Sequence, residues 1–374
     1  MTRNIRRGLL ASAAVLCTAA GSVAVGGTAF ASSSSSKTSS TLPAPPSGST
    51  SLTETGSTLL YPLWNLWVPG YTGKYSQVNI TTAGTGSGTG ITDASNGTVD
   101  IGASDAYLSP SEVSASPHLQ NIPLAISAQI VAYNVPGVTA HLKLSGKVLS
   151  EIYQGQVTSW NASQIASINP GVTLPNTPIV TLHRADSSGD TFLFTTYLSK
   201  TDASGWGTKV GYNTTVSWPN APGALAETGN SGMVSGCKAT PGCIAYIGIS
   251  YLTQSLQAGL GEAELQNGKG NYELPSAQTI EAEANYYVNK TPANGTISMI
   301  YGPVSNGYPI INYEYAIVNS QQSSSDTAQA IRSVLDWAIN LKEGNSSQYL
   351  SPVYFQPLPS KIVTASQKQI SNIK

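Results

Sequence analysis

The sequence predicts an α/β protein with two lobes, on two observations. Short β-rich runs alternate with helical patterns along most of the chain, an order that is typical of α/β folds. A chain of 374 residues normally forms two domains, but no linker separates two halves of its body. We therefore expect strands to cross from one lobe to the other.

The expected elements follow recognisable local signals. The expected strands are short runs rich in β-branched and apolar residues, at 77–82, 99–102, 128–134, 179–183, 245–249 and 311–318. Three expected helices follow Ser57, Ser87 and Ser188, because serine is favoured where a helix begins. Further helices are expected at 147–153, 276–288, 327–341 and 361–373.

The first 31 residues have the pattern of a secretory signal peptide. A start with three arginines precedes a short apolar run at 9–20, and residues 29–31 read Ala-Phe-Ala, a cleavage signal. Polar residues make this stretch weak for a membrane span. A lipid anchor would use Cys17, but Leu16 stands where a lipobox needs a small residue. We expect export without lipid, with the mature chain beginning at Ser32 and residing at the cell surface, in the cell-wall space or in the medium.

Composition limits the possible partners of the mature chain. Residues 32–52 are rich in Ser, Thr and Pro with one charge, so we predict a flexible tether there. Without the leader, 15 basic residues face 19 acidic ones, a formal charge of −4. Nucleic acid is excluded as a partner, because its binding needs a basic face. An anionic ligand must be held by local dipoles, because the net field repels it.

Two cysteines remain after removal of the leader, Cys237 and Cys243, on either side of a Pro-Gly turn. In an exported chain this spacing favours a local disulfide. A metal site would need two more ligands, and the three histidines are scattered through the sequence. We predict a disulfide and no metal.

Three turns rich in Ser, Thr and Gly are candidates for an anion site: 56–60, 84–90 and 188–190. Glycines let the backbone approach a ligand, hydroxyl groups donate hydrogen bonds, and a helix start adds partial positive charge. Each turn alone is equally typical of an ordinary helix start. The glycines at 84–90 fit neither the dinucleotide fingerprint nor a P-loop, so a nucleotide site is rejected.

Two charged positions next to these turns have open interpretations. Asp105 follows a short strand, and a carboxylate near an anion is favourable only if the anion brings a proton, as phosphate does and sulfate does not. The alternative for Asp105 is a turn or helix-capping residue. Arg184 either forms a surface ion pair with Asp186 or grips oxygens of a ligand while Asp186 orients its guanidinium group.

The assembled pattern resembles a known family. The segments 56–62, 84–88, 98–105 and 184–189 are similar in sequence and order to motifs of the PstS phosphate-binding proteins of phosphate ABC transporters. Segments 153–160 and 310–317 are similar too, and the resemblance runs from about Thr53 to the C-terminus. It is closest to the mycobacterial or actinobacterial members.

The resemblance implies a type II periplasmic-binding-protein fold, with two α/β lobes, crossover strands as a hinge and phosphate in the cleft between the lobes. Lobe I would comprise 53–130 plus 312–374, and lobe II 131–311. The implied functions are phosphate binding and delivery to a membrane permease, by a monomer without catalysis, cofactor or metal. Asp186 would hold Arg184. The implied phosphate-binding residues are Ser57, Thr58, Leu59, Ser87, Asp105, Arg184, Ser188, Gly189 and Asp190.

Two positions depart from the enterobacterial pattern, and two other functions stay open. Leu59 replaces a phenylalanine, which is harmless if only its N–H group binds. Asp190 replaces a threonine: it either complements the helix dipole or acts as a second acceptor beside Asp105. The alternative functions are a phosphatase-like enzyme on the same fold and a surface adhesin or antigen with a vestigial cleft.

Overall fold

The computed structural model describes residues 42–374. The expected leader, Cys17 and the first part of the expected tether lie outside these residues. None of the helices within 42–374 is both long and apolar enough to cross a membrane.

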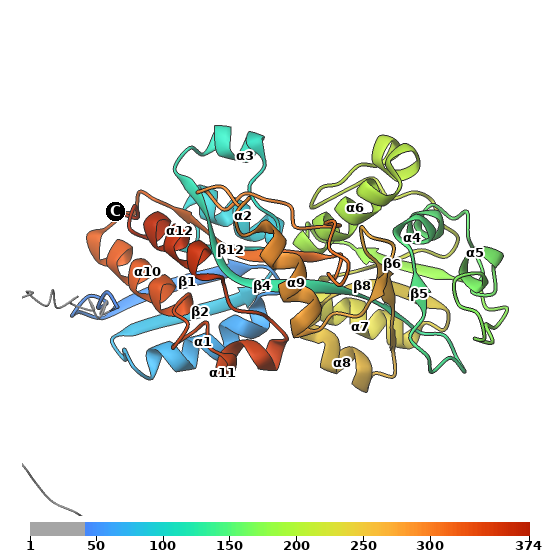
Figure 1. Ribbon diagram of the computed structural model, residues 1–374. Helices are drawn as coiled ribbons and strands as arrows, with labels where there is room; N and C mark the ends of the chain where they lie inside the picture. Colours follow the sequence, from blue (N-terminus) through green and yellow to red (C-terminus); the bar gives the residue numbers. More distant parts are fainter. Residues whose placement is uncertain (1–41) are drawn as a thin grey trace, which may run out of the picture. The chain divides into compact units, whose positions relative to one another are not determined.

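One half of the main sheet combines strands from the first part of the described chain with one strand from its last part. β1 (Thr50–Gly56) pairs in parallel with β2 (Val78–Gly84) on one side and β3 (Ile101–Ser104) on the other. β12 (Ile311–Asn319) then pairs antiparallel with both β3 and β4 (Leu119–Tyr133). The order β2-β1-β3-β12-β4 brings strands from both ends of the chain side by side (Figure 1).

The sheet continues on the far half of β4. There β4 pairs antiparallel with β8 (Cys243–Gly248) and with β9 (Gly261–Glu262). Beyond β8, β6 (Val180–Arg184) and β7 (Leu225–Glu227) add in parallel. A separate sheet joins three short strands, β5 (Lys143–Leu144), β10 (Glu264–Gln266) and β11 (Tyr272–Glu273).

The strand β4 therefore belongs to both α/β lobes. Its residues 119–128 pair with β12, and its residues 129–133 pair with β8. Figure 1 shows β4 running from the strands around β12 to β8 without an intervening loop. This confirms the expectation that strands join the lobes, although the expected strand at 128–134 covered only the second half. Pro123 and polar residues concealed the first half, and Pro123 is tolerated because it adjoins a β-bulge: the next residue, Leu124, has no partner between Tyr315 and Glu314.

Helices cover both halves of the sheet (Figure 1). The main helices are α1 (Tyr61–Thr72), α2 (Ser87–Asn96), α4 (Gly146–Tyr153), α6 (Gly189–Thr201), α7 (Gly229–Ala239), α9 (Ala277–Tyr287), α10 (Ser325–Ala338) and α12 (Ser360–Ile370). The shorter ones are α3 (Pro110–Ala115), α5 (Ser163–Ala166), α8 (Leu252–Gln257) and α11 (Ser347–Leu350). All seven expected helices are present, but α1 begins at Tyr61, after a turn at 58–60.

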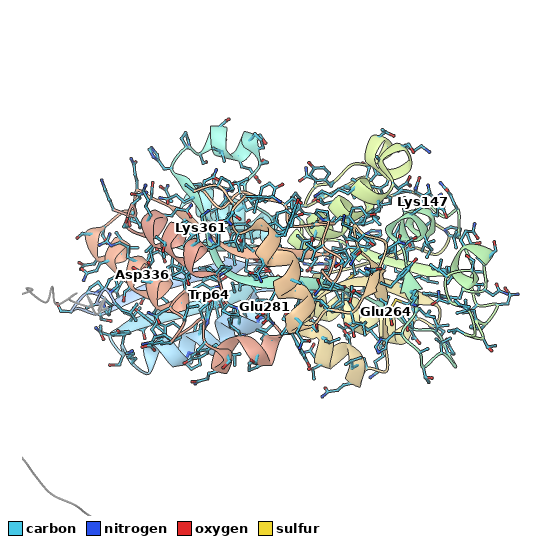
Figure 2. All side chains as sticks on the ribbon, in the orientation of Figure 1. Trp64, Lys147, Glu264, Glu281, Asp336 and Lys361 are labelled. Carbon is cyan, nitrogen blue, oxygen red and sulfur yellow. A yellow bond between two sulfur atoms is a disulfide. The ribbon has the colours of Figure 1, made fainter. Side chains whose placement is uncertain are left out.

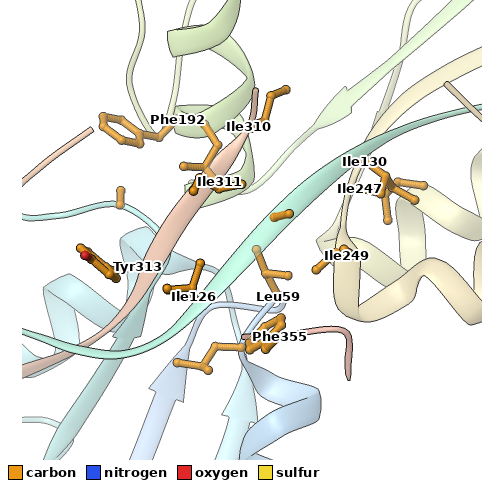
Figure 3. Packing of buried hydrophobic residues seen from close by; sticks show 14 of the residues in the cluster. Leu59, Ile126, Ile130, Phe192, Ile247, Ile249, Ile310, Ile311, Tyr313 and Phe355 are labelled. Carbon is orange, nitrogen blue, oxygen red and sulfur yellow. The ribbon is translucent and has the colours of Figure 1, made fainter. Parts of the chain in front are cut away.

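Burial separates the apolar from the charged side chains. Trp64 of α1 is buried, whereas Lys147 of α4, Glu281 of α9 and Lys361 of α12 are exposed (Figure 2). Close packing of apolar side chains continues across the crossover strands, from Ile126 and Ile130 of β4 to residues of both lobes (Figure 3). The crossover is thus embedded in core.

Residues 42–52, the C-terminal part of the expected tether, pack against the rest of the fold. Residues 50–52 already belong to β1, and Pro45 and Pro46 are buried. The Ser333 Oγ atom of α10 donates to the Pro43 carbonyl at 2.8 Å, and Gln329 Nε2 donates to the Ala44 carbonyl at 3.0 Å. Prolines lose little entropy on ordering, so this segment packs despite its low apolar content.

The predicted disulfide is confirmed: Cys237 and Cys243 are bonded. The bridge joins the end of α7 to the start of β8. Among residues 42–374, no group of three or more His, Cys, Asp and Glu side chains is arranged to hold a metal ion.

Candidate functional site

The candidate site lies where parallel strands end. Turns that follow β1, β2, β3, β6 and β7 lead into it, so the carboxyl ends of strands from both lobes meet there. Ligands of open α/β sheets bind at such edges. The three turns that the sequence singled out come together, with Asp105 and Asp190 buried among them.

Two serines, one that follows β1 and one that follows β2, donate to Asp105. Ser57 Oγ donates to Oδ1 of Asp105, and Ser87 Oγ lies 3.3 Å from Oδ2. Ser57 also accepts a hydrogen bond from the Leu60 N–H group at 2.9 Å, so it stabilises the turn at 58–60. Gly56 makes this turn possible, because its φ is +144° and a Cβ atom would lie 2.1 Å from the Ala103 carbonyl oxygen. Ser57 thus acts before α1 begins and not as its cap.

The glycine-rich turn at 84–90 touches the turn of lobe II directly. The Gly88 N–H group donates to the Ser187 carbonyl at 3.1 Å. A Cβ atom on Gly86 would lie 2.6 Å from the Asp186 carboxylate, and one on Gly189 would lie 2.4 Å from the Asp105 carboxylate. These positions need glycine because two backbone turns approach each other closely. The two lobes are therefore closed on one another at the site.

Arg184 is buried and bound to two aspartates. Its Nε donates to Asp186 Oδ1 at 2.7 Å, its NH2 group donates to Asp186 Oδ2, and its NH1 group donates to Asp190 Oδ2 at 3.0 Å. The surface ion pair considered from the sequence is wrong, because the Arg184 side chain is only 1% exposed. The Gly229 N–H group holds Asp186 from the other side, at 3.1 Å. Asp186 thus holds the Arg184 guanidinium group in place, and the guanidinium also neutralises Asp190.

Asp190 points into the same polar cluster. Besides Arg184, the Asn230 Nδ2 atom donates to its Oδ2 at 2.7 Å, and the Gln129 Nε2 atom donates to its Oδ1 at 3.1 Å. The Asp190 N–H group donates to Ser188 Oγ at 3.1 Å, which confirms Ser188 as the cap of α6. A carboxylate that only complemented the helix dipole would not need these three side-chain partners.

Thr58 and Leu59 reach the site in different ways. The Thr58 Oγ1 atom accepts hydrogen bonds from Asn230, from Nδ2 at 2.9 Å and from the backbone N–H group at 3.3 Å. The Leu59 side chain is buried away from the polar cluster, against Gly248 and near Ile126 and Ile249 (Figure 3). Only the backbone of Leu59 is left for a ligand, so its side chain can differ from phenylalanine without consequence for polar contacts.

Burial shifts the acidity of the cluster. It raises the pKa of Asp105 to about 7, with help from the negative charge of Asp190. Burial also raises the pKa of Asp190, although Arg184, Gln129 and Asn230 oppose the shift. For Asp186, partial burial is outweighed by the bonds from Arg184, which hold its pKa below the usual range. Asp105 is therefore the carboxyl group of this cluster whose charge changes near neutral pH.

Three contributors were not expected from the sequence. Asn230 stands at the start of α7, Gln129 lies on the crossover strand β4, and the Tyr246 hydroxyl of β8 accepts from the Arg184 N–H group at 2.9 Å. Only Asn230 had a local signal, since Thr228-Gly229-Asn230 is a further strand-to-helix turn with a glycine at φ +66°. The Gly- and Ser-rich composition of α7 concealed that helix.

Two α/β lobes that share crossover strands and enclose a buried polar site define a solute-binding protein. Residues 39–340 match a family model described as "PBP superfamily domain". "Phosphate-binding protein PstS" of Methanocaldococcus jannaschii is 32% identical over 327 residues, or 82% of each chain. "Phosphate-binding protein PstS 2" of Mycobacterium tuberculosis is 30% identical over 317 residues, or 79% of each chain.

Solved structures agree with this class. A high-affinity periplasmic phosphate-binding protein, PfluDING, bound with phosphate, has a TM-score of 0.69 at 20% identity and covers 85% of this chain and 93% of its own. An ABC-type phosphate transport receptor from Vibrio cholerae has a TM-score of 0.54 at 18% identity, with 82% and 100% covered. At these identities the likeness shows the fold. The chain belongs to the PBP superfamily and, within it, to the PstS family, which confirms the predicted resemblance and fold class.

Proposed function

We propose that this protein binds inorganic phosphate between its lobes, outside the cytoplasmic membrane, and delivers it to the permease of an ABC transporter. The observation that carries the proposal is the buried Asp105 at the meeting point of helix-start turns. Around it stand donors from both lobes, and the cation of the cluster, Arg184, is already shared by two carboxylates. Such a site suits an anion that brings both negative charge and a proton. The names of the family members support the same ligand.

In this proposal the ligand is held mainly by dipoles. The first N–H groups of a helix or turn have no backbone partner within it, so Thr58, Leu59 and Gly189 offer backbone donors, and the Asp190 N–H group would join them when released from Ser188 Oγ. Ser57, Ser87 and Ser188 add hydroxyl groups, which would turn from their present partners to the ligand. Arg184 has five N–H groups and uses three of them on aspartates, so two remain for phosphate.

Asp105 is the proposed selector between phosphate and sulfate. A phosphate dianion carries one proton and can donate it to a carboxylate, whereas sulfate at neutral pH has none. Sulfate would place an oxygen with no proton against a buried acceptor, which costs binding energy. In this proposal Asp105 accepts the proton of phosphate, which explains why an anion-binding site contains a buried aspartate.

The alternative functions have no observation in their favour. The relatives carry the names of phosphate-binding proteins, not of enzymes, which supports the prediction that the chain is not an enzyme. An enzyme would need an activated nucleophile, and the buried serines Ser87 and Ser188 bond to an aspartate and to a backbone N–H group. Purified protein should therefore release no nitrophenol from a chromogenic phosphate ester.

A titration tests the proposal. Trp218 stacks on Tyr246, at 5.9 Å between ring centroids, and Tyr246 bonds the backbone of Arg184, so tryptophan fluorescence reports on the site. We expect saturable changes with phosphate and none with sulfate at the same concentration. Asp336→Asn, in α10, serves as a control that should leave both results unchanged. No response to phosphate, together with unaltered thermal stability in its presence, would contradict the proposal.

Asp190 as a second acceptor is a separate prediction. Monoanionic phosphate could satisfy both Asp105 and Asp190, whereas the dianion would leave one carboxylate against an oxygen without a proton. Phosphate affinity should then fall as pH rises through the second ionisation of phosphate, and Asp190→Thr should flatten this fall. Equal pH profiles for the two proteins would restrict Asp190 to holding Arg184 and the start of α6.

We also propose that the exported protein is a monomer without lipid whose mature chain begins at Ser32. Intact-mass measurement of native protein tests the processing, and a diacylglyceryl mass on Cys17 would contradict it. Sedimentation tests the monomer. A cross-link from either lobe to the co-expressed permease would support the delivery step.

A further inference from the structure

Glu314 is a carboxyl group buried directly behind Asp105. β12 pairs antiparallel with β3, and Tyr315 stands opposite Ser104, so the next position along the ladder brings Glu314 beside Asp105. The Glu314 side chain is fully buried. It belongs to segment 310–317, which the sequence resemblance singled out but to which the proposed function gives no role.

The hydrogen bonds of Glu314 leave one oxygen facing an acid. Its Oε1 atom accepts from Asn312 Nδ2 at 3.0 Å and from Ser127 Oγ. Its buried Oε2 atom receives no N–H or O–H donor among residues 42–374. The two residues are neighbours across the β12–β3 ladder, and Asn312 Nδ2 donates both to Glu314 Oε1 at 3.0 Å and to the Asp105 carbonyl at 3.3 Å. Two buried, adjacent carboxyl groups, one of them with an oxygen that receives no donor, favour a shared proton over two negative charges.

The surroundings decide which carboxyl group keeps that proton. Asp105 receives two serine hydroxyl groups and lies in the field of Arg184, all of which favour its charged form. Glu314 also receives two donors, but both of them reach Oε1, so its Oε2 atom has none, whereas each oxygen of Asp105 receives a hydroxyl group. Burial and the charge of Asp105 also raise the pKa of Glu314 well above its usual range. Glu314 is therefore the carboxyl group better suited to keep the proton.

Within residues 42–374, the carboxyl groups on or next to the elements packed against β12 are Asp105 after β3, Asp93 on α2, and Glu281 and Glu283 on α9. The neutral groups that bond Glu314 are Ser127 on β4 and Asn312 on β12. Glu281 is exposed to solvent, and Glu283 accepts from the Gly302 N–H group at 2.6 Å.

We propose that Glu314 is a positioning residue for anion selection: it stays a neutral acid and donates its proton to Asp105, so that Asp105 meets the ligand only as an acceptor. This inference rests on the proposed phosphate site. Glu314 supplies a proton to the side of Asp105 that faces β12. The proton that bonds to the side facing the ligand must therefore come from the ligand.

Two substitutions separate the effect of the Glu314 proton from the effect of the space that the Glu314 side chain fills. Glu314→Gln keeps an oxygen for Ser127 and Asn312 and an N–H donor for Asp105, but it cannot ionise. Glu314→Met fills similar space and donates nothing. Phosphate affinity is measured by fluorescence between about pH 5 and pH 9 for both variants, for the wild type and for Glu283→Gln, a control outside the site.

We expect the Gln variant and the control to follow the wild-type profile. In the Met variant the pKa of Asp105 rises, so Asp105 is neutralised at a higher pH and loses its acceptor role earlier as pH falls. The acidic limb of the affinity profile should move up by about one pH unit, which is roughly tenfold weaker binding near pH 6 relative to the wild type.

Two results would overturn the inference. If Glu314→Gln bound phosphate at least tenfold more tightly than the wild type near pH 8, the substitution would have removed a negative charge from Glu314. Glu314 would then not be a neutral acid in the wild type. An unchanged profile in a folded Glu314→Met protein would mean that Glu314 only fills space.

Infrared spectra of the ligand-free protein test the proton independently of binding. The wild-type minus Glu314→Gln difference at neutral pH should contain the C=O band of a protonated carboxyl group, and its absence would refute the inference even if Glu314→Met fails to fold. A wild type that shows the band but binds no phosphate would refute the proposed function instead.

Discussion

Asp105 and Asp190 lie in one buried cluster, yet the protein holds them by different means. Asp190 is matched by a cation, since Arg184 bonds it at 3.0 Å, and by two amides, Asn230 and Gln129. Asp105 is instead bonded by neutral groups, the hydroxyl groups of Ser57 and Ser87, and lies beside the carboxyl group of Glu314. Asp190 thus forms part of a neutralised scaffold, whereas Asp105 keeps a charge that a proton can remove.

From this difference we expect Asp190 and its partners to contribute mainly to stability, and Asp105 to contribute mainly to the choice of anion. Removing one partner from a buried ion pair leaves an uncompensated charge, which is costly. Removing a hydroxyl-bonded acceptor that titrates near pH 7 mainly changes which anion is accepted. Each of the following predictions tests one side of that comparison.

The largest effect is expected for Arg184→Met. It leaves Asp186 and Asp190 without their cation, so the free energy of unfolding should fall by about 3–5 kcal/mol and phosphate binding should be lost. Denaturant unfolding and fluorescence titration measure the two losses. Lys74→Met, which breaks the exposed ion pair with Glu343, is the control and should cost no more than about 1 kcal/mol. Equal losses for the two variants would contradict the scaffold role.

The next effect concerns selectivity. Asp105→Asn can donate to a sulfate oxygen, so the ratio of phosphate to sulfate affinity should fall at least tenfold, about 1.4 kcal/mol. Asp190→Asn should change this ratio less, because Arg184 already neutralises Asp190. Isothermal titration with each anion gives the two ratios. The comparison breaks down if the two variants change the ratio equally.

A smaller effect is expected in the pH dependence of stability without ligand. Because the pKa of Asp105 is raised to about 7 in the folded protein, the fold binds this proton more tightly than the unfolded chain does. Its stabilising contribution is complete below about pH 4 and is lost as pH rises through 7. Asp105→Asn should lose less stability than the wild type between about pH 5 and pH 8, on the order of 1–3 kcal/mol. Parallel curves from thermal unfolding would place the titration elsewhere.

The smallest effect on binding is expected at the disulfide. The loop between Cys237 and Cys243 is short, so its loss should cost roughly 2 kcal/mol of stability. The bridge lies at the far end of α7 from Asn230, so phosphate affinity should change less than twofold. Replacing both cysteines by serine and repeating the titration tests this. A collapse of binding would show that the end of α7 is held in place by the bridge.

The sequence predicted the site where the signals are local. Turns with glycine and serine, the Cys237–Cys243 pair and the Arg184–Asp186 pair span only a few residues, and the structure bears out their contacts. The partners of Asp190 and Thr58 could not be predicted in this way. Asn230 is 40 residues from Asp190 and 172 from Thr58, and it stands in a helix whose small polar residues give no periodic pattern.

Two fold predictions failed for a related reason. The first half of β4 contains Pro123, which usually argues against a central strand, and the bulge in β4 itself, at Leu124, explains why it is allowed. β1 was missed because its polar residues, such as Glu54, continue the composition of the preceding Ser- and Thr-rich run. In both cases a distant partner strand decides the conformation.

β4 runs unbroken through both halves of the sheet, so the number of its residues fixes which way side chains point in the second half relative to the first. Side chains alternate between the two faces of a strand, so deleting one residue between Ala125 and Gln129 would turn every later side chain to the opposite face. Gln129 would then point away from Asp190, and the two sets of donors would no longer face one another. The number of residues in this part of β4, together with direct contacts such as that between Gly88 and Ser187, sets how the two halves of the anion site face each other.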